Sequence, residues 1–212
     1  MPFTTANYEL IRSGCRRSAA KLVPILGEIF QPHTVIDLGC GEGWWLREFA
    51  LRGCEVLGVD AGEHAGAVLA ANEFQTVNLA STPDFDYGRF DLAISLEVAE
   101  HLPPQRAGWF VDTLARHADH IVFSAAVPGQ GGIGHLNEQW PSYWAELFDA
   151  RGFSVSGSLR WTIWHMAPDD IENWYAQNLL IASRHPENLR RNLSFDESIV
   201  DVIHPVLWRS RQ

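Results

Sequence analysis

The chain has 212 residues, 46% of them hydrophobic, which fits one globular α/β domain with a buried core and short extensions. Its formal net charge of −10 at pH 7 repels phosphate backbones and disfavours nucleic acid as a partner. No hydrophobic run approaches the roughly 20 residues that cross a bilayer, and the first residues lack a secretion-signal pattern, so we expect a cytoplasmic protein without membrane contact.

The predicted elements alternate between helices and strands along the chain. Residues 5–30 have the hydrophobic spacing of a helix, and Pro24 within them predicts a break into two helices. Strands are predicted at 33–38, 55–59, 74–78, 90–96, 120–126, 153–159 and 178–183, with helices at 44–52, 65–72, 103–117 and 142–151. A Trp-rich insertion covers residues 161–175, and a polar, irregular segment follows from Pro186. This alternation indicates a parallel sheet covered on both faces.

No linker interrupts this order, so we expect a single domain over residues 1–212. Within it, residues 1–32 would form a small helical lid, residues 33–184 a Rossmann-like core and residues 185–212 a C-terminal tail. The insertion and the tail around His204 are expected to cover the pocket of an acceptor molecule.

The most informative stretch is VIDLGCGEG at residues 35–43, where a strand runs into Gly39, Gly41 and Gly43 and then into a helix. Glycines allow a sharp turn and let a ligand approach the backbone closely. Asp60 ends the second strand, where a carboxylate can accept hydrogen bonds from both hydroxyls of an adenosine ribose. NAD and S-adenosylmethionine both need such a contact.

The glycine spacing separates these two ligands. A dinucleotide-binding loop follows the pattern G-x-G-x-x-G, whose third glycine would fall at position 44. This chain has Trp44 there, and a bulky residue at that point disfavours a bound pyrophosphate. An NAD-dependent oxidoreductase is therefore the weaker alternative.

Three segments, VIDLGCGEG, EVLGVD and FDLAISLEVAEHLP, resemble the successive motifs of class I methyltransferases that use S-adenosylmethionine. The resemblance runs from about residue 33 to residue 183. It implies an α/β, Rossmann-like sheet of seven strands in the order 3-2-1-4-5-7-6, with strand 7 antiparallel and helices on both faces. It also implies cofactor contacts from Asp37, Gly39, Gly41 and Gly43 around the methionine part, Asp60 at the ribose, Ala61, Asn78 and Leu79 at the adenine, and Ser95, Leu96 and Glu97 on the opposite side.

One of these positions departs from the family. Asn78 stands where the family commonly has Asp, so its adenine contact would lack charge assistance and be weaker.

Polar residues after the fourth and fifth strands are the candidate catalytic groups. His101 titrates near neutral pH and is a candidate base, with a structural histidine as its alternative. Residues 134–144 resemble a loop with the pattern GHxNEQWPxYW, found in a methyltransferase subfamily near glycan and natural-product pathways. Within it we favour His135 as general base and Glu138 as the residue that orients it, a helix cap being the alternative. A metal on His135 and Glu138 has no evident third ligand, so we expect none.

Together these features predict methyl transfer from S-adenosylmethionine to a hydroxyl of a small molecule, such as a sugar or secondary metabolite. The reaction would be an in-line displacement helped by a general base. N- or C-methylation and a non-catalytic S-adenosylmethionine-binding domain are the alternatives. The identity of the acceptor and the oligomeric state stay open, a homodimer included.

Overall fold

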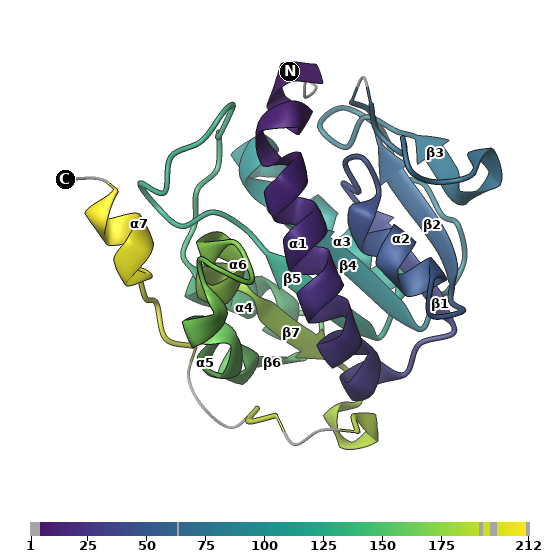
Figure 1. Ribbon diagram of the computed structural model, residues 1–212. Coiled ribbons are helices and arrows are strands. Elements are labelled where there is room, and N and C mark those ends of the chain that lie inside the picture. The colour runs from purple at the N-terminus through teal and green to yellow at the C-terminus, as the bar shows by residue number, and fades with distance from the viewer. Residues whose placement is uncertain (1–4, 63, 191–192, 196–198, 211–212) are drawn as a thin grey trace.

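The computed structural model describes residues 5–62, 64–190, 193–195 and 199–210, built around a seven-stranded sheet (Figure 1). The spatial order is β3-β2-β1-β4-β5-β7-β6; β7 is antiparallel to β5 and β6, and the other pairs are parallel. This confirms the predicted topology. The strands are β1 (Thr34–Leu38), β2 (Glu55–Asp60), β3 (Phe74–Thr76), β4 (Leu92–Leu96), β5 (His120–Ser124), β6 (Ser154–Ser156) and β7 (Leu180–Ser183).

Successive side chains of a strand point to opposite faces of the sheet, so strands made of hydrophobic residues need cover on both faces. Helices provide that cover here. Val35 of β1 belongs to the core under one layer of helices, and Ile36 belongs to the core under the other layer. The first layer consists of α1 (Thr5–Phe30), α2 (Trp44–Ala50), α5 (Ser158–Ile163) and α6 (Asn173–Asn178), and the second of α3 (Ala107–His117) and α4 (Pro141–Asp149). In Figure 1, α1 crosses in front of the sheet.

The first helix continues through Pro24, so the predicted break into two helices is wrong. Proline removes one hydrogen bond inside a helix, which is a local cost. The buried face of α1 packs against α2 and the sheet, and five of its hydrophobic side chains are at most 1% exposed: Ala19, Leu22, Val23, Leu26 and Ile29. Burial of this face stabilises the helix as one unit despite the proline. Residues 1–4 of the predicted lid lie outside the described residues.

The helix predicted at residues 65–72 is also wrong, because only a 3-10 turn forms there, at Ala71–Glu73. The backbone of this segment makes short turns of its own, such as the bond from the Leu69 N–H to the Gly66 carbonyl at 2.9 Å, and it also pairs with the glycine loop. The N–H of Gly66 donates to the Gly41 carbonyl at 2.7 Å, and that of Val68 donates to the Glu42 carbonyl at 3.0 Å. Gly66 has φ +70°, which an α-helix does not accommodate. These hydrogen bonds therefore fix the segment against the glycine loop between β1 and α2.

The C-terminal part of the chain is more regular than its sequence predicted. β6 is shorter than the expected strand because α5 already begins at Ser158. The tail, expected to be irregular, contains α7 (Pro205–Arg209), whose first turn is capped by the His204 ring accepting from the Val206 N–H at 3.3 Å. Proline is favoured at the first helical position because its missing N–H would be unpaired there anyway. Tail residues 191–192, 196–198 and 211–212 lie outside the described residues.

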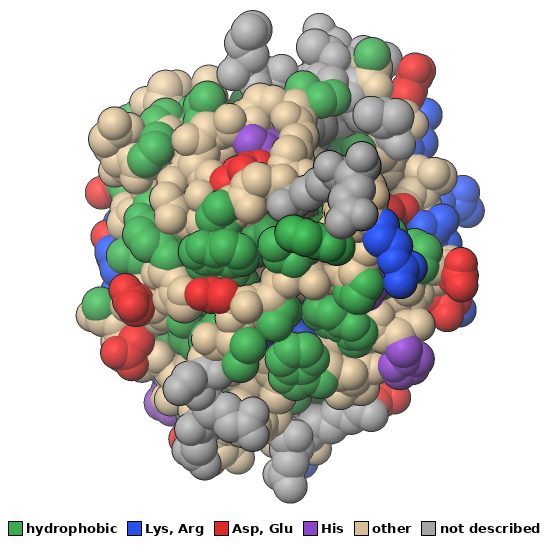
Figure 2. All heavy atoms as spheres, turned by 90° about the vertical axis from the view of Figure 1, so that its left-hand side faces the viewer, with side chains coloured by type: hydrophobic (Ala, Val, Ile, Leu, Met, Phe, Trp, Pro, Cys, Tyr) green, Lys and Arg blue, Asp and Glu red, His purple; other side chains and the backbone are tan. Residues whose placement is uncertain are grey.

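Hydrophobic side chains gather on the face of the molecule that lies at the left of Figure 1, the side on which α7 is found (Figure 2). Exposed large hydrophobic residues of the described chain are Leu51, Ile133, Leu136, Trp161, Val200 and Trp208. None of the described helices combines the length and the hydrophobicity that a membrane span requires.

Candidate active site

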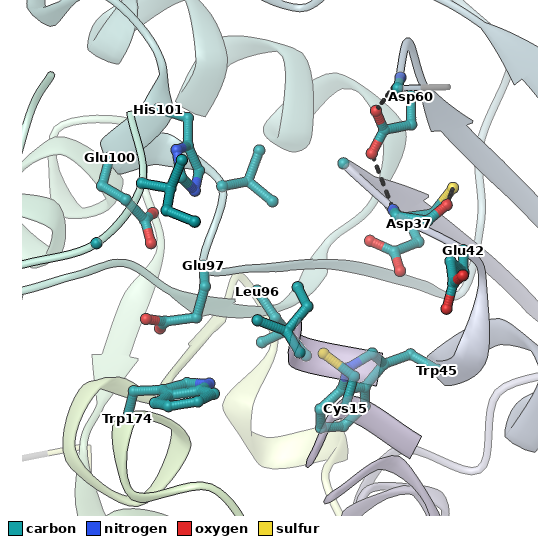
Figure 3. Close-up of a pocket in the computed structure, with 18 of the residues that line it drawn as sticks. Cys15, Asp37, Glu42, Trp45, Asp60, Leu96, Glu97, Glu100, His101 and Trp174 are labelled. Carbon is teal, nitrogen blue, oxygen red and sulfur yellow. Dashed lines mark hydrogen bonds between the residues drawn. The ribbon is translucent and has the colours of Figure 1, made fainter. Parts of the chain in front are cut away.

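A cavity of about 670 Å³ opens at the carboxyl ends of β1, β2 and β4, the edge where parallel α/β sheets bind ligands. Its polar side chains form two groups, with Leu96 between them (Figure 3). One group lies around the glycine loop and comprises Asp37, Glu42 and Asp60; the other follows β4 and comprises Glu97, Glu100 and His101. The volume falls in the range of roughly 300–1,000 Å³ typical of small-ligand sites.

The glycine loop lies between β1 and α2 and brings bare backbone to the cavity wall. Gly39 has φ +91°, and a Cβ on it would lie 2.4 Å from a methyl carbon of Val98. Only glycine fits this position, because a side chain there is both strained and obstructed. Gly39 and Gly41 line the cavity, whereas Gly43 is the N-cap of α2 and is not part of the wall.

Asp60, at the tip of β2, organises this loop. Its carboxylate accepts from the N–H groups of Gly41 at 2.8 Å, Ala61 at 2.5 Å and Gly62 at 3.0 Å. Burial, and then the neighbouring Asp60 carboxylate, raise the pKa of Asp37 well above its ordinary value. A positively charged ligand beside these two acids would relieve that repulsion and stabilise their ionised forms.

Ala61, Asn78 and Leu79 line the adjacent part of the cavity, as expected for an adenine site. The Asn78 side-chain oxygen already accepts from the Ala80 N–H at 3.0 Å. Arg106 fixes the same turn by donating to the Leu79 carbonyl at 2.9 Å. The Asn78 side-chain oxygen is thus already engaged by the backbone.

Of the three predicted cofactor contacts at the end of β4, two line the cavity and one is buried below its wall. Ser95 is fully buried beneath the cavity and donates its hydroxyl to the Leu38 carbonyl at 2.8 Å, joining β4 to β1. Leu96 and Glu97 line the cavity. Glu97 has φ +57°, an uncommon conformation for a residue other than glycine.

Two amide side chains hold the Glu97 carboxylate. Gln130 donates to it at 3.0 Å and Asn178 at 3.1 Å, so the loop after β5 and the end of α6 meet at this acid. Burial raises the pKa of Glu97, although the bonds from Asn178, Ser124 and Gln130 oppose that effect. Gln130 was not predicted as a site residue, because a contact with a residue 33 positions away leaves no local pattern in the sequence.

The rings of His101 and His135 meet edge to face at the same end of the cavity, with ring centroids 4.9 Å apart and an angle of 82° between their planes. The Nδ1 atom of His135 lies 2.8 Å from a carboxylate oxygen of Glu138. Glu138 is not part of the cavity wall, and it also accepts from the Gly129 and Gly131 N–H groups at 2.7 and 2.8 Å. Burial, and then the nearby His135, lower the pKa of His101 to about 4, so its ring is neutral at pH 7.

Glu42 is a residue of the cavity wall that was not predicted from the sequence. Arg12 of α1 and Trp44 both donate to the Glu42 carboxylate, Arg12 at 2.6 Å and Trp44 at 2.8 Å. Burial opposes ionisation of Glu42, but these bonds outweigh it and leave its pKa below the ordinary value.

Trp174 and Tyr175 line the cavity from the Trp-rich insertion, as expected of that segment. His204 does not, because it is buried against Trp164 instead.

The family model of a methyltransferase domain matches residues 10–158. The chain belongs to this methyltransferase family. Its methyl donor is S-adenosylmethionine, and the alternative of an NAD-dependent oxidoreductase is set aside.

This methyltransferase is similar to curated relatives and to solved structures. It is 26% identical over 190 residues to a ubiquinone biosynthesis O-methyltransferase of Alkalilimnicola ehrlichii, covering 81% of this chain and 72% of the relative. It is 32% identical over 100 residues to the protein of that name from Acinetobacter baylyi, covering 42% of each. The magnesium protoporphyrin IX methyltransferase of Synechocystis PCC 6803, solved with bound S-adenosylmethionine, is 24% identical with a TM-score of 0.55, covering 82% of this chain and 81% of that one. That likeness shows a shared fold.

The residues present fit this donor. Bound S-adenosylmethionine supplies a methyl group on positively charged sulfur, a group already activated for displacement. A cation at the glycine-loop end of the cavity would lie near the carboxyls of Asp37 and Asp60 and would favour the ionised form of Asp37, which burial opposes. The bare backbone at Gly39 leaves room for a ligand where a Cβ would collide.

Proposed function

We propose that this methyltransferase acts on a hydroxyl of a small molecule, with His135 as the general base and Glu138 as the residue that orients it. The bond of 2.8 Å between His135 Nδ1 and Glu138 carries the proposal, because the His135 ring lines the cavity. The names of the relatives above, both O-methyltransferases, support a hydroxyl acceptor.

The direction of proton transfer follows from the hydrogen bonds. An ionised carboxylate only accepts, so Nδ1 of His135 carries the hydrogen and Nε2 carries the lone pair. Nε2 is then the atom that removes the acceptor proton as the oxygen attacks the methyl group. Glu138 would stabilise the resulting imidazolium, as the third group of a catalytic triad does.

The cofactor would lie across the glycine-loop end of the cavity, and the acceptor at the end with Glu97 and the histidines. We assign Asp37, Gly39 and Gly41 to the methionine part, Asp60 to the ribose, and Ala61, Asn78 and Leu79 to the adenine. Leu96 and Glu97 would lie between donor and acceptor, while Gly43 and Ser95 would shape the site from beneath it. Trp174 and Tyr175 would help to exclude water from the reacting atoms.

Finer parts of the proposal come from the sequence. The loop at residues 134–144 favours a sugar or natural-product acceptor. The division into a lid at 1–32, a core at 33–184 and a tail at 185–212 is likewise a proposal, as are a cytoplasmic location and a homodimer. N- or C-methylation and a non-catalytic S-adenosylmethionine-binding role are the competing functions.

A His135→Ala variant tests the proposal. Labelled methyl transfer to a panel of catechols, sugars and phenolic metabolites should identify an acceptor, and mass spectrometry of the product should place the methyl on oxygen. The variant should then turn over about 100-fold more slowly or worse with unchanged affinity for S-adenosylhomocysteine. His185→Ala removes an exposed histidine and is the matched control. Full turnover by His135→Ala would refute its role as base.

A further inference from the structure

Glu100, His101 and His135 form a compact group at the acceptor end of the cavity. One potential ligand atom from each lies within 4.8 Å of the other two. Two backbone bonds hold the contributing segments together, because the N–H groups of Leu136 and Asn137 both donate to the Glu100 carbonyl, at 2.7 and 3.0 Å. The sequence suggested no third metal ligand beside His135 and Glu138, whereas the fold brings two more residues to His135.

The Glu100 side chain is unusual for a buried acid. The residue is 1% exposed, and no well-aligned hydrogen bond reaches either carboxylate oxygen from the described residues. The nearby N–H groups of Glu100 and Ala126 offset only part of the effect of burial on its pKa, and the carboxyls of Glu97 and Glu138 add negative charge around it. Buried carboxylates in proteins are normally paired or bound to a metal ion. A cation bound at this position would compensate the charge of the ionised Glu100 carboxylate.

We propose that Glu100, His101 and His135 bind one divalent transition-metal ion. Two imidazoles and one carboxylate suit such ions better than Mg²⁺ or Ca²⁺, which prefer oxygen ligands alone. Three protein ligands also leave a coordination position for an incoming molecule.

The hydrogen bonds of both histidines orient them as ligands. Glu138 binds Nδ1 of His135, which directs the lone pair to Nε2. Nδ1 of His101 lies 3.4 Å from the Gly134 carbonyl, and because a carbonyl only accepts, this contact favours the same tautomer. Metal-bound histidines commonly donate their second nitrogen to a carboxylate or a carbonyl in this way. The neutral His101 ring is the form that binds a metal.

The ligand atoms must move slightly closer on binding. Metal–ligand distances of about 2.0–2.2 Å place ligand atoms roughly 3–3.5 Å apart. The group in the structure extends to 4.8 Å, so rotation about side-chain bonds has to bring it together. The open cavity wall leaves room for such rotation.

The consequence for the reaction rests on the proposed function. A cation beside the acceptor hydroxyl lowers the pKa of that hydroxyl, so its proton is released to water. The oxygen then forms its bond to the methyl carbon while the carbon–sulfur bond breaks, and the electron pair stays on sulfur as a neutral thioether. A bound ion would occupy Nε2 of His135, so the general-base role proposed above applies to the metal-free enzyme, and in the metal-loaded enzyme the ion would activate the hydroxyl instead.

Direct binding measurements test the site without an acceptor. The full chain, stripped with a chelator, is titrated with Mn²⁺ followed by electron paramagnetic resonance, and with Co²⁺ followed by visible absorption. We expect one ion per chain, no competition by equimolar Mg²⁺, and at least 100-fold weaker binding by Glu100→Gln and by His135→Gln. Glu187→Gln, which alters an exposed acid beside His185, is the matched control and should bind as the unmodified chain does.

The outcomes separate this proposal from the proposed function. Absence of stoichiometric binding, or unchanged affinity in folded Glu100→Gln and His135→Gln, overturns the metal site and leaves His135 as the base. Tight binding that both variants lose supports the metal site, even if every acceptor found is methylated on nitrogen or carbon. Once an acceptor is known, chelation should slow methylation, and Mn²⁺ should restore it.

Discussion

Replacing Asp60 with alanine should weaken cofactor binding by an amount that the structure allows us to work out. If Asp60 accepts from both ribose hydroxyls, two charge-assisted hydrogen bonds are lost. The carboxylate already accepts from the N–H groups of Gly41, Ala61 and Gly62, so each ribose bond contributes at the low end, about 1–2 kcal/mol. The loss of about 2–4 kcal/mol corresponds to a dissociation constant roughly 30- to 700-fold higher.

The assay is calorimetric titration with S-adenosylhomocysteine, repeated with its 2′-deoxy analogue. Asp60→Ala also removes bonds within the loop, so a single comparison mixes the two effects. The double-mutant cycle that combines Asp60→Ala with removal of the ligand's 2′-hydroxyl gives the interaction free energy between the two groups, and this isolates the ribose contact. The unmodified chain should bind the deoxy analogue about 5- to 30-fold more weakly, and Asp60→Ala should hardly distinguish the two ligands.

Glu55→Ala is the matched control, since Glu55 is an exposed acid at the other end of the same strand. It should leave both affinities unchanged. Equal discrimination against the deoxy analogue by the unmodified chain and Asp60→Ala, with both proteins folded by circular dichroism, would refute the ribose assignment.

Two further predictions concern stability and are tested by urea denaturation. Gly39→Ala places a Cβ 2.4 Å from Val98 at φ +91° and should lower the free energy of unfolding by about 2–4 kcal/mol, from strain and overpacking together. Gly53→Ala, at φ +89° with open space around it, should lower it by only about 1–2 kcal/mol, and equal losses would contradict the clash. Burial lowers the pKa of His117, whose ring accepts from the Tyr87 N–H, so the unfolded chain takes up a proton first as the pH falls. Stability should therefore decrease below about pH 6.5 by up to ~1.4 kcal/mol per pH unit, and an identical slope in His117→Gln would contradict this.

The sheet was predictable because its signals are local. The run VIDLGCGEG carries a strand, a turn and a helix start within nine residues, and Asp60 then marks the tip of the next strand. Topology followed from the resemblance of these motifs to a known family. Residues whose role depends on their own segment, such as Gly39 and Asp60, are located where the sequence placed them.

The wrong or missing predictions have a common physical cause: contacts with distant segments of the chain override the local sequence pattern. Residues 65–72 have helical spacing, but the N–H groups of Gly66 and Val68 donate to the carbonyls of Gly41 and Glu42 in the glycine loop. Pro24 predicts a break, but the buried face of α1 outweighs it. Glu100 could not be recognised as a partner of His135, because they meet only when the loop after β5 returns to the end of β4.

The two hydrogen bonds from Leu136 and Asn137 to the Glu100 carbonyl join main-chain atoms only. They therefore do not depend on which side chain stands at Ile133, in the glycine-rich tip of the same loop. Gly129, Gly131 and Gly134 of this tip have positive φ, which favours glycine at those positions. Ile133 is 51% exposed and lines the cavity, whereas the glycine loop lies between β1 and α2, so exchange of Ile133 would alter one part of the cavity wall and leave the glycine loop unchanged.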